Sequence, residues 1–244
     1  MINIQYSPIV IQEKRQKVRE QVLRESTNLC TGVIDRISDT DLRLLYQCYD
    51  RIFLDGWLNK HLNQPLRLTL STRLSKAAGK TMVRFKQGSR EILDIEIRIG
   101  TSFLFNHHQL ERDKYVAGLP AQDGVEALML VMEHELCHVL EYCLYGESSC
   151  SRERFKILAA NLFGHTSNSH QLPTDTEIAM ATYGYEPGET VVFSYDNHLL
   201  QGVITQIRKR AAVMVQDPGG QYIDKKGLRY TKYYVPLSHL ERKQ

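Results

Sequence analysis

The 244-residue sequence predicts an α+β fold, in which a core of helices and a small antiparallel sheet is followed by a small all-β domain. Apolar residues recur at helical spacing across residues 123–145 and 151–163, and they alternate with polar residues in short segments between residues 66 and 99. After residue 187 only short apolar segments separated by polar turns follow, which is typical of an all-β domain.

The first 38 residues are predicted to form an N-terminal helical arm. Residues 8–30 are rich in charge and their apolar positions follow mixed spacing, which indicates a surface helix or a poorly ordered segment. Asp39 is expected to cap the next helix, which runs to about Leu54 and is ended by Asp55-Gly56. The main domain is predicted to span residues 39–182.

Three short strands are predicted in the first half of this domain. Ile95, Ile97 and Ile99 alternate with charged residues and form the clearest half-buried strand of the chain. Leucines alternate in the same way across residues 66–70, and a further strand is expected around residues 83–85. Short strands this close in sequence favour a small antiparallel sheet.

Two helices are predicted in the second half of the domain. Residues 123–145 carry a broad apolar stripe, and Gly146 stands where a helix commonly ends. A second helix is expected from about Ser151 to Phe163, with Gly164 after it.

A second domain is predicted over residues 187–244, after a linker near residues 183–188. Its expected strands are residues 190–195, 201–208, 211–216 and 232–236, and residues 217–220 (Asp-Pro-Gly-Gly) form a strong turn signal. Short strands with polar turns over a segment of this length fit a small SH3-like or Tudor-like barrel. Residues 191–195 and 202–205 also resemble the first two strands of SH3-like folds.

The longest predicted helix carries the sequence His134-Glu135-Leu136-Cys137-His138. Two histidines four residues apart project from the same side of a helix, so both imidazoles can bind one metal ion. Glu135 can reach a water molecule on that ion and take its proton, which is the chemistry of the HExxH motif. The motif predicts a Zn2+ site with His134 and His138 as ligands and Glu135 as general base. A structural histidine pair is the alternative, although other residues already supply the apolar face of the helix.

A catalytic zinc ion has three protein ligands, and the residues leave the third one open. Glu141 shares the helix face of the two histidines, and His165 and His170 follow later in the chain. Cys150 offers a thiolate, which is a good zinc ligand. A closed structural site with four protein ligands is a further alternative.

Several segments between residues 41 and 172, about half of the chain, resemble the SprT-like metallopeptidases, the family that includes Spartan. The matching segments are residues 45–56 (its opening helix), 74–79 (a turn between its strands), 94–99 (the strand before its active-site helix), 134–138 (its motif), and 163–166 with 170–172 (the segment that follows). The order and spacing of these segments together carry the resemblance.

The resemblance implies a minimal zincin-like metallopeptidase core that uses zinc to cleave proteins on or near DNA, such as crosslinked proteins. The family's third ligand is the histidine of an HGxxF segment, and residues 151–155 match that segment with Phe155 in place. Ser151 stands where the histidine belongs, and a neutral hydroxyl is a poor zinc ligand. Cys150, one residue earlier, is therefore the first choice for third ligand. The alternative is a degenerate protein that binds nucleic acid or protein without turnover.

The C-terminal domain is basic, with nine Lys and Arg against five Asp and Glu in residues 187–244, whereas the remainder of the chain is close to neutral. These basic residues interleave with tyrosines, and such a surface can contact DNA phosphates and stack on unpaired bases, which makes DNA a candidate partner of this domain. The alternatives are a solvated surface or a peptide-binding barrel. The basic residues singled out are Arg208, Lys209, Arg210, Lys225, Lys226 and Arg229.

The sequence contains no run of eighteen apolar residues, so no membrane span and no membrane partner are expected. The first twenty residues lack the basic start and apolar core of a secretory signal, which predicts a cytoplasmic location. The five cysteines are irregularly spaced, and free thiols are expected in that reducing compartment.

Overall fold

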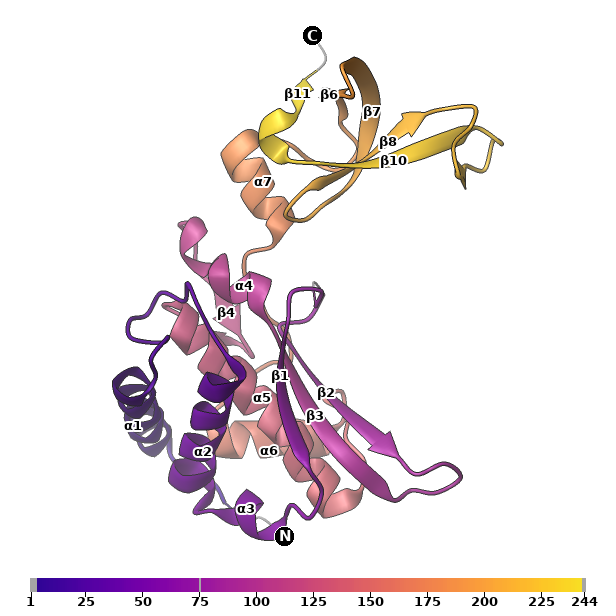
Figure 1. Ribbon diagram of the computed structural model, residues 1–244. Coiled ribbons are helices and arrows are strands. Elements are labelled where there is room, and N and C mark those ends of the chain that lie inside the picture. Colours follow the sequence, from indigo (N-terminus) through magenta and orange to yellow (C-terminus); the bar gives the residue numbers. More distant parts are fainter. Residues whose placement is uncertain (1–3, 75, 243–244) are drawn as a thin grey trace. The chain divides into compact units, whose positions relative to one another are not determined.

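The computed structural model describes residues 4–74 and 76–242. The chain divides into two compact units, Met1–Leu172 and Pro173–Gln244, each with its own apolar core (Figure 1). This boundary precedes the linker predicted at residues 183–188, because helix α7 (Asp175–Tyr183) buries Ala179 in the core of the second unit. None of the described helices is long and apolar enough to cross a bilayer.

The first unit contains six helices among its described residues. They are α1 (Pro8–Glu25), α2 (Asp39–Leu54), α3 (Trp57–His61), α4 (Thr101–Phe105), α5 (Gly124–Tyr145) and α6 (Glu153–Phe163). Ser38, not Asp39, is the residue that precedes and caps α2, because its extended backbone lets its N–H reach the carboxylate of Asp41 at 2.7 Å. Short segments η1 (His107–Gln109), β4 (Tyr115–Val116) and β5 (Leu119–Pro120) connect α4 to α5.

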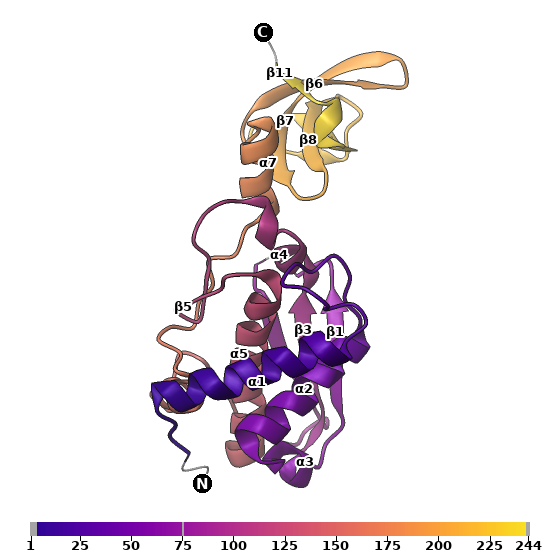
Figure 2. The same cartoon turned by 90° about the vertical axis from the view of Figure 1, so that its left-hand side faces the viewer.

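Helix α1 is part of the first unit and not a separate arm. Ile11, Val18 and Val22 are buried in its core, and Figure 2 shows α1 lying across α2 and α5. These three residues are spaced by seven and four, so they form one narrow stripe on a helix. Charged residues surround the stripe, and for this reason the sequence pattern resembled a surface segment.

The sheet of the first unit is mixed, so the prediction of an antiparallel sheet was wrong. Its strands are β1 (Leu66–Ser71), β2 (Gly79–Phe85) and β3 (Ile92–Gly100), in the order β1-β3-β2. The chain reverses after β1 and again after β2, and β3 then lies between them. As a result β3 is parallel to β1 and antiparallel to β2. The central place suits β3, because Ile95, Ile97 and Ile99 are all buried against the helices.

The helices cover one face of this sheet, and α5 packs on β2 and β3 (Figure 1). Helix α5 begins after Asp123, whose carboxylate accepts a hydrogen bond from the N–H of Glu126 at 2.9 Å. It ends at Gly146, which has a φ of 69°, a conformation that suits glycine. The predicted bounds of α5 are confirmed, whereas α6 begins two residues later than expected.

The second unit contains a six-stranded antiparallel sheet with the strand order β11-β6-β7-β8-β10-β9. The strands are β6 (Thr190–Tyr195), β7 (His198–Ile207), β8 (Ala211–Gln216), β9 (Tyr222–Ile223), β10 (Arg229–Val235) and β11 (Glu241–Arg242). All four predicted strands are present, with shifted ends in β7 and β10. The expected turn is confirmed too, since the N–H of Gly220 donates to the carbonyl of Asp217 at 2.9 Å. The overall class is therefore α+β, as predicted.

Candidate metal centre

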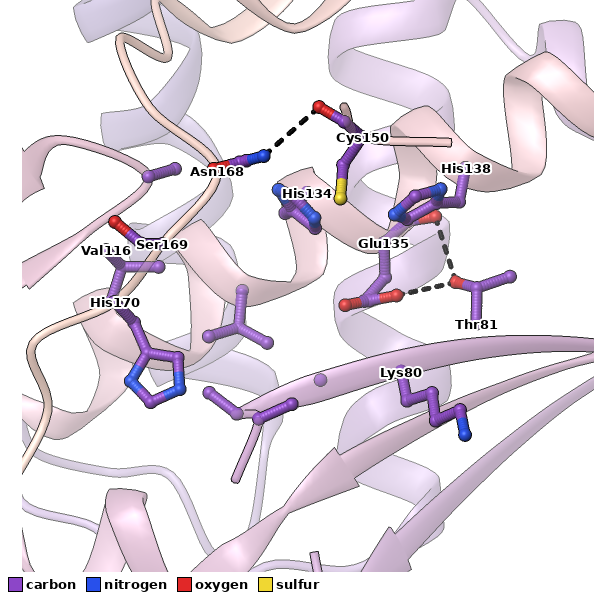
Figure 3. A pocket seen from close by; sticks show the side chains of 15 residues that line it. Lys80, Thr81, Val116, His134, Glu135, His138, Cys150, Asn168, Ser169 and His170 are labelled. Atoms are coloured by element: carbon purple, nitrogen blue, oxygen red, sulfur yellow. Dashed lines mark hydrogen bonds between the residues drawn. The ribbon is translucent and has the colours of Figure 1, made fainter. Parts of the chain in front are cut away.

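Three side chains with metal-binding atoms meet in the first unit. His134 and His138 come from consecutive turns of α5, and Cys150 comes from the turn before α6. One potential ligand atom of each lies within 4.8 Å of the others, and Figure 3 shows the three side chains pointing toward one another. The group can hold a metal ion, and it contains the third donor that was the first choice from the sequence.

The connection between α5 and α6 brings Cys150 back over α5. Gly146 ends α5, and the N–H of Ser149 then donates to Glu141 at 3.3 Å. The carbonyl of Cys150 accepts a hydrogen bond from the side chain of Asn168 at 3.2 Å. Ser151 faces solvent and hydrogen-bonds to Ser149 at 2.9 Å, so it does not join the metal-binding group.

Glu141 is not a member of the group; it positions His138 through a serine. The hydroxyl of Ser148 donates to Oε2 of Glu141 at 2.7 Å, and the same hydroxyl oxygen lies 2.7 Å from Nδ1 of His138. Since its proton goes to Glu141, Ser148 accepts from an Nδ1–H, which leaves Nε2 of His138 as the metal-binding nitrogen. Arg154 pairs with the buried Glu141 at 2.6 Å. Such support fixes ligand orientation in metal sites.

Both histidines are neutral near pH 7. Burial lowers the pKa of His134 to about 3, and its histidine neighbours, His138 first, contribute to that lowering. Burial also lowers the pKa of His138 to about 4, against the opposing effect of Glu141. Neutral imidazoles have a free lone pair, so the site does not have to release protons from them before it binds a metal.

Glu135 lies beside the group, between α5 and β2 (Figure 3). Burial raises the pKa of its carboxyl group to about 7, although the hydroxyl of Thr81, which donates to Oε2 at 2.7 Å, lowers it. The other carboxylate oxygen of Glu135, Oε1, lies next to Gly79. A Cβ atom on Gly79 would lie 2.6 Å from Oε1 of Glu135 and 2.8 Å from Cγ1 of Val131. The missing side chain at residue 79 therefore makes room for Glu135.

Substituting Gly79 with alanine is expected to destabilise the protein by about 1–3 kcal/mol, since β2 or Glu135 has to move. Urea unfolding measures this change. Gly219→Ala is the matched control, because a Cβ there would meet a single side-chain atom at 3.5 Å. Equal midpoints for the two variants would contradict the tight fit of Gly79 against α5.

A cavity of about 260 Å³ opens over the three ligands and Glu135. His170 lines it at a distance from the ligands (Figure 3), and its ring packs edge-on against Phe103. His165 does not join them: its Nε2 lies 2.9 Å from Oε2 of Glu133, in a buried cluster elsewhere on α5. Neither histidine takes the place of Cys150. Gly79 and Thr81 also line the cavity: Gly79 ends the matched segment 74–79, whereas no sequence motif identifies Thr81.

The basic residues singled out in the second unit are exposed. Arg208, Lys209 and Arg210 lie at the turn between β7 and β8, Lys225 and Lys226 lie between β9 and β10, and Arg229 begins β10. The nearby tyrosines differ in role, since Tyr233 packs against Phe193 while Tyr234 is 64% exposed.

The donor set fits zinc, since two imidazoles, one thiolate and an adjacent carboxylate form an open site. Ligand atoms around tetrahedral zinc lie about 3.3–3.6 Å apart, given zinc–nitrogen and zinc–sulfur distances of roughly 2.0–2.3 Å. The three potential ligand atoms all lie within 4.8 Å of one another, so side-chain movements of at most roughly an ångström would bring them to that spacing. Comparison of the chain with protein-family models, with curated proteins and with solved structures gave no match.

Proposed function

We propose that the chain is a zinc-dependent peptidase of the SprT-like kind, with a zincin-like first unit, that cleaves proteins on or near DNA. One observation carries the proposal. The imidazoles of His134 and His138, the sulfur of Cys150 and the carboxylate of Glu135 line a single cavity. Zinc peptidases need three ligands and a carboxylate in this arrangement.

The residues divide into two roles. His134, His138 and Cys150 would hold the ion, with His138 oriented by Ser148 and Glu141. A bound zinc ion supplies Lewis acidity, which polarises a carbonyl group and makes water more acidic. Glu135 would accept at Oε1 a proton from the water that attacks the peptide carbonyl, while Thr81 holds Oε2, and would return that proton to the amine that leaves when the C–N bond breaks.

The second unit supports the choice of substrate. Its exposed lysines and arginines can contact phosphates, and its exposed tyrosines can stack on unpaired bases. Its antiparallel strands are compatible with an SH3-like or Tudor-like barrel. We propose that this unit helps to bring the peptidase to proteins bound on DNA, in the cytoplasm of the cell.

Cys150→Ser is expected to weaken zinc binding more than tenfold, because a hydroxyl replaces the only thiolate of the group. Elemental analysis after dialysis measures the zinc-to-protein ratio, with an expected value near one for the unmodified chain. Cys143→Ser is the matched control, since Cys143 is a half-buried free thiol of α5 outside the group. Equal zinc content in both variants would remove Cys150 from the site.

Peptidase activity is tested with a protein crosslinked to a DNA oligonucleotide and with the same protein free of DNA. The expected result is cleavage of the crosslinked protein, which stops when a chelator removes zinc and returns when zinc is added. Cleavage unaffected by the chelator would contradict a zinc mechanism. If the chain binds the DNA and cleaves neither substrate, it is instead a binding module without turnover.

A further inference from the structure

The sheet segment of the first unit holds more excess positive charge than the second unit. Residues 66–100 contain eight Lys and Arg against three Asp and Glu, an excess of five. The first unit is nevertheless close to neutral, since acidic residues elsewhere in it balance this segment. A charge count over the whole unit therefore hides a concentrated basic region.

The strand pairing gathers this charge on one face of the sheet. Alternate residues of a strand point to opposite faces, and Ile95, Ile97 and Ile99 point to the helices. The register pairs Arg67 with Glu96, Lys80 with Arg98, and Arg84 with Asp94, all on the other face. We call this surface the basic sheet face; it consists of Arg67, Lys80, Arg84 and Arg98, and we include with it the exposed Arg73 and Lys76 of the adjoining β1–β2 loop.

Two carboxylates neutralise only part of the basic sheet face. Asp94 and Glu96 are almost fully buried beneath arginine side chains. Arg67 lies 3.1 Å from each carboxylate, Arg84 pairs with Asp94, and Arg98 lies 2.7 Å from Glu96. Three arginines thus share two carboxylates, and one positive charge remains.

The remaining basic residues of this face are Arg73, Lys76 and Lys80. Among the residues that the structure describes, Arg73, Lys76 and Lys80 form no ion pair. Lys80 also lies directly opposite Arg98, and like charges in such cross-strand pairs are destabilising. Figure 3 shows the Lys80 side chain directed away from the three metal-binding residues. An anion bound at this face would offset the repulsion.

We infer that the basic sheet face binds the phosphate backbone of nucleic acid beside the candidate metal centre. The loop that carries Arg73 and Lys76 also supplies Ala77 and Ala78 to the wall of the cavity, so the two surfaces adjoin. The choice of DNA as the polyanion rests on the proposed function, although phosphate binding itself requires no turnover.

The chemistry of the face favours backbone contacts. Among the outward positions that pair in regular register on β1, β2 and β3, only Met82 is apolar and none is aromatic; the exposed side chains of Phe85 and Leu93 lie beyond these positions, at the register shift between β2 and β3. Base stacking relies mainly on aromatic side chains, and insertion into a membrane surface requires several exposed apolar ones. Binding is therefore independent of sequence, includes duplex DNA, and weakens steeply as salt is added.

The test is the anisotropy of a labelled DNA duplex titrated with the full-length chain at several salt concentrations. The variant carries Arg73→Gln, Lys76→Gln and Lys80→Gln, and is expected to bind at least about tenfold more weakly at low salt. The slope of log affinity against log salt should become shallower by roughly 0.9 for each phosphate that the variant no longer neutralises. The matched control carries Arg208→Gln, Lys209→Gln and Arg210→Gln, which removes equal charge from the second unit and is expected to weaken binding less.

A variant with Arg73→Lys, Lys76→Arg and Lys80→Arg keeps the charge and should bind like the unmodified chain. Lys80→Gln alone, in case the triple variant does not fold, should still weaken binding severalfold. The inference is overturned if the second-unit variant loses the affinity while the sheet variant keeps it, or if the unmodified chain shows no salt-dependent binding. Zinc content and cleavage of a DNA-free protein, measured in parallel, report separately on the proposed peptidase.

Discussion

Replacing Glu135 with glutamine is expected to slow peptide-bond cleavage by roughly 10²–10⁴-fold, while the zinc content stays near one per chain. Glutamine has almost the same shape, and its amide oxygen can still accept the hydrogen bond from Thr81. It cannot accept a proton at the position of Oε1. The variant keeps His134, His138 and Cys150. It is therefore expected to retain metal binding while it loses proton transfer.

The measurement is the cleavage rate of the crosslinked protein, with zinc determined on the same sample. Glu126→Gln is the matched control, because Glu126 lies on the same helix and its carboxylate accepts a backbone hydrogen bond that an amide oxygen can keep. The control should cleave at the normal rate. Unchanged cleavage by Glu135→Gln would remove Glu135 from the mechanism.

Replacing Arg15 with methionine is expected to destabilise the protein by roughly 3–5 kcal/mol, because an uncompensated charge remains in the core. Glu133 is fully buried, and Arg15 forms two hydrogen bonds with it, at 2.8 and 2.9 Å. Tyr49 and His165 donate to the same carboxylate. Burial by itself raises the pKa of Glu133, but Arg15 and His165 lower it by more. The net pKa is therefore below its usual value, and the carboxylate stays ionised.

Chemical denaturation of the full chain measures the decrease in stability. Arg24→Met is the control: it removes an exposed arginine from the same helix and should leave the midpoint unchanged, since surface ion pairs contribute little. Adding Glu133→Gln to Arg15→Met should restore part of the stability, because no charge is then buried. A double variant less stable than Arg15→Met alone would show that charge burial is not the cause.

The residues of the candidate metal centre were predictable where local geometry fixes them. The spacing of His134 and His138 places both on one side of a helix whatever surrounds it. Cys150 was identified by the donor chemistry of its thiol together with its place next to Ser151, which occupies the third-ligand position in the resemblance. Its approach to the histidines depends on Gly146, on the hydrogen bond from Ser149 to Glu141 and on Asn168. These are tertiary interactions, which a spacing pattern does not contain.

The difference between local sequence patterns and tertiary interactions also explains which parts of the fold could be predicted. The isoleucines of β3 alternate, so the strand was clear, but its parallel partner β1 depends on how the chain reverses between them. Helix α1 was misread because only three of its residues are buried. Glu133 was overlooked as well, since its neighbour Arg15 is distant in sequence and no periodicity connects the two.

The position of α1 determines the order in which its contacts can form while the chain is being synthesised. Its packing partner α2 follows directly in the chain, but its ion-pair partner is made much later: Arg15 bonds to Glu133 and to the carbonyl of Phe163. The ion pair between Arg15 and Glu133 can therefore form only after α5 has been synthesised, whereas α1 can pack on α2 earlier. Such large sequence separations slow folding and lengthen the exposure of apolar surface to chaperones.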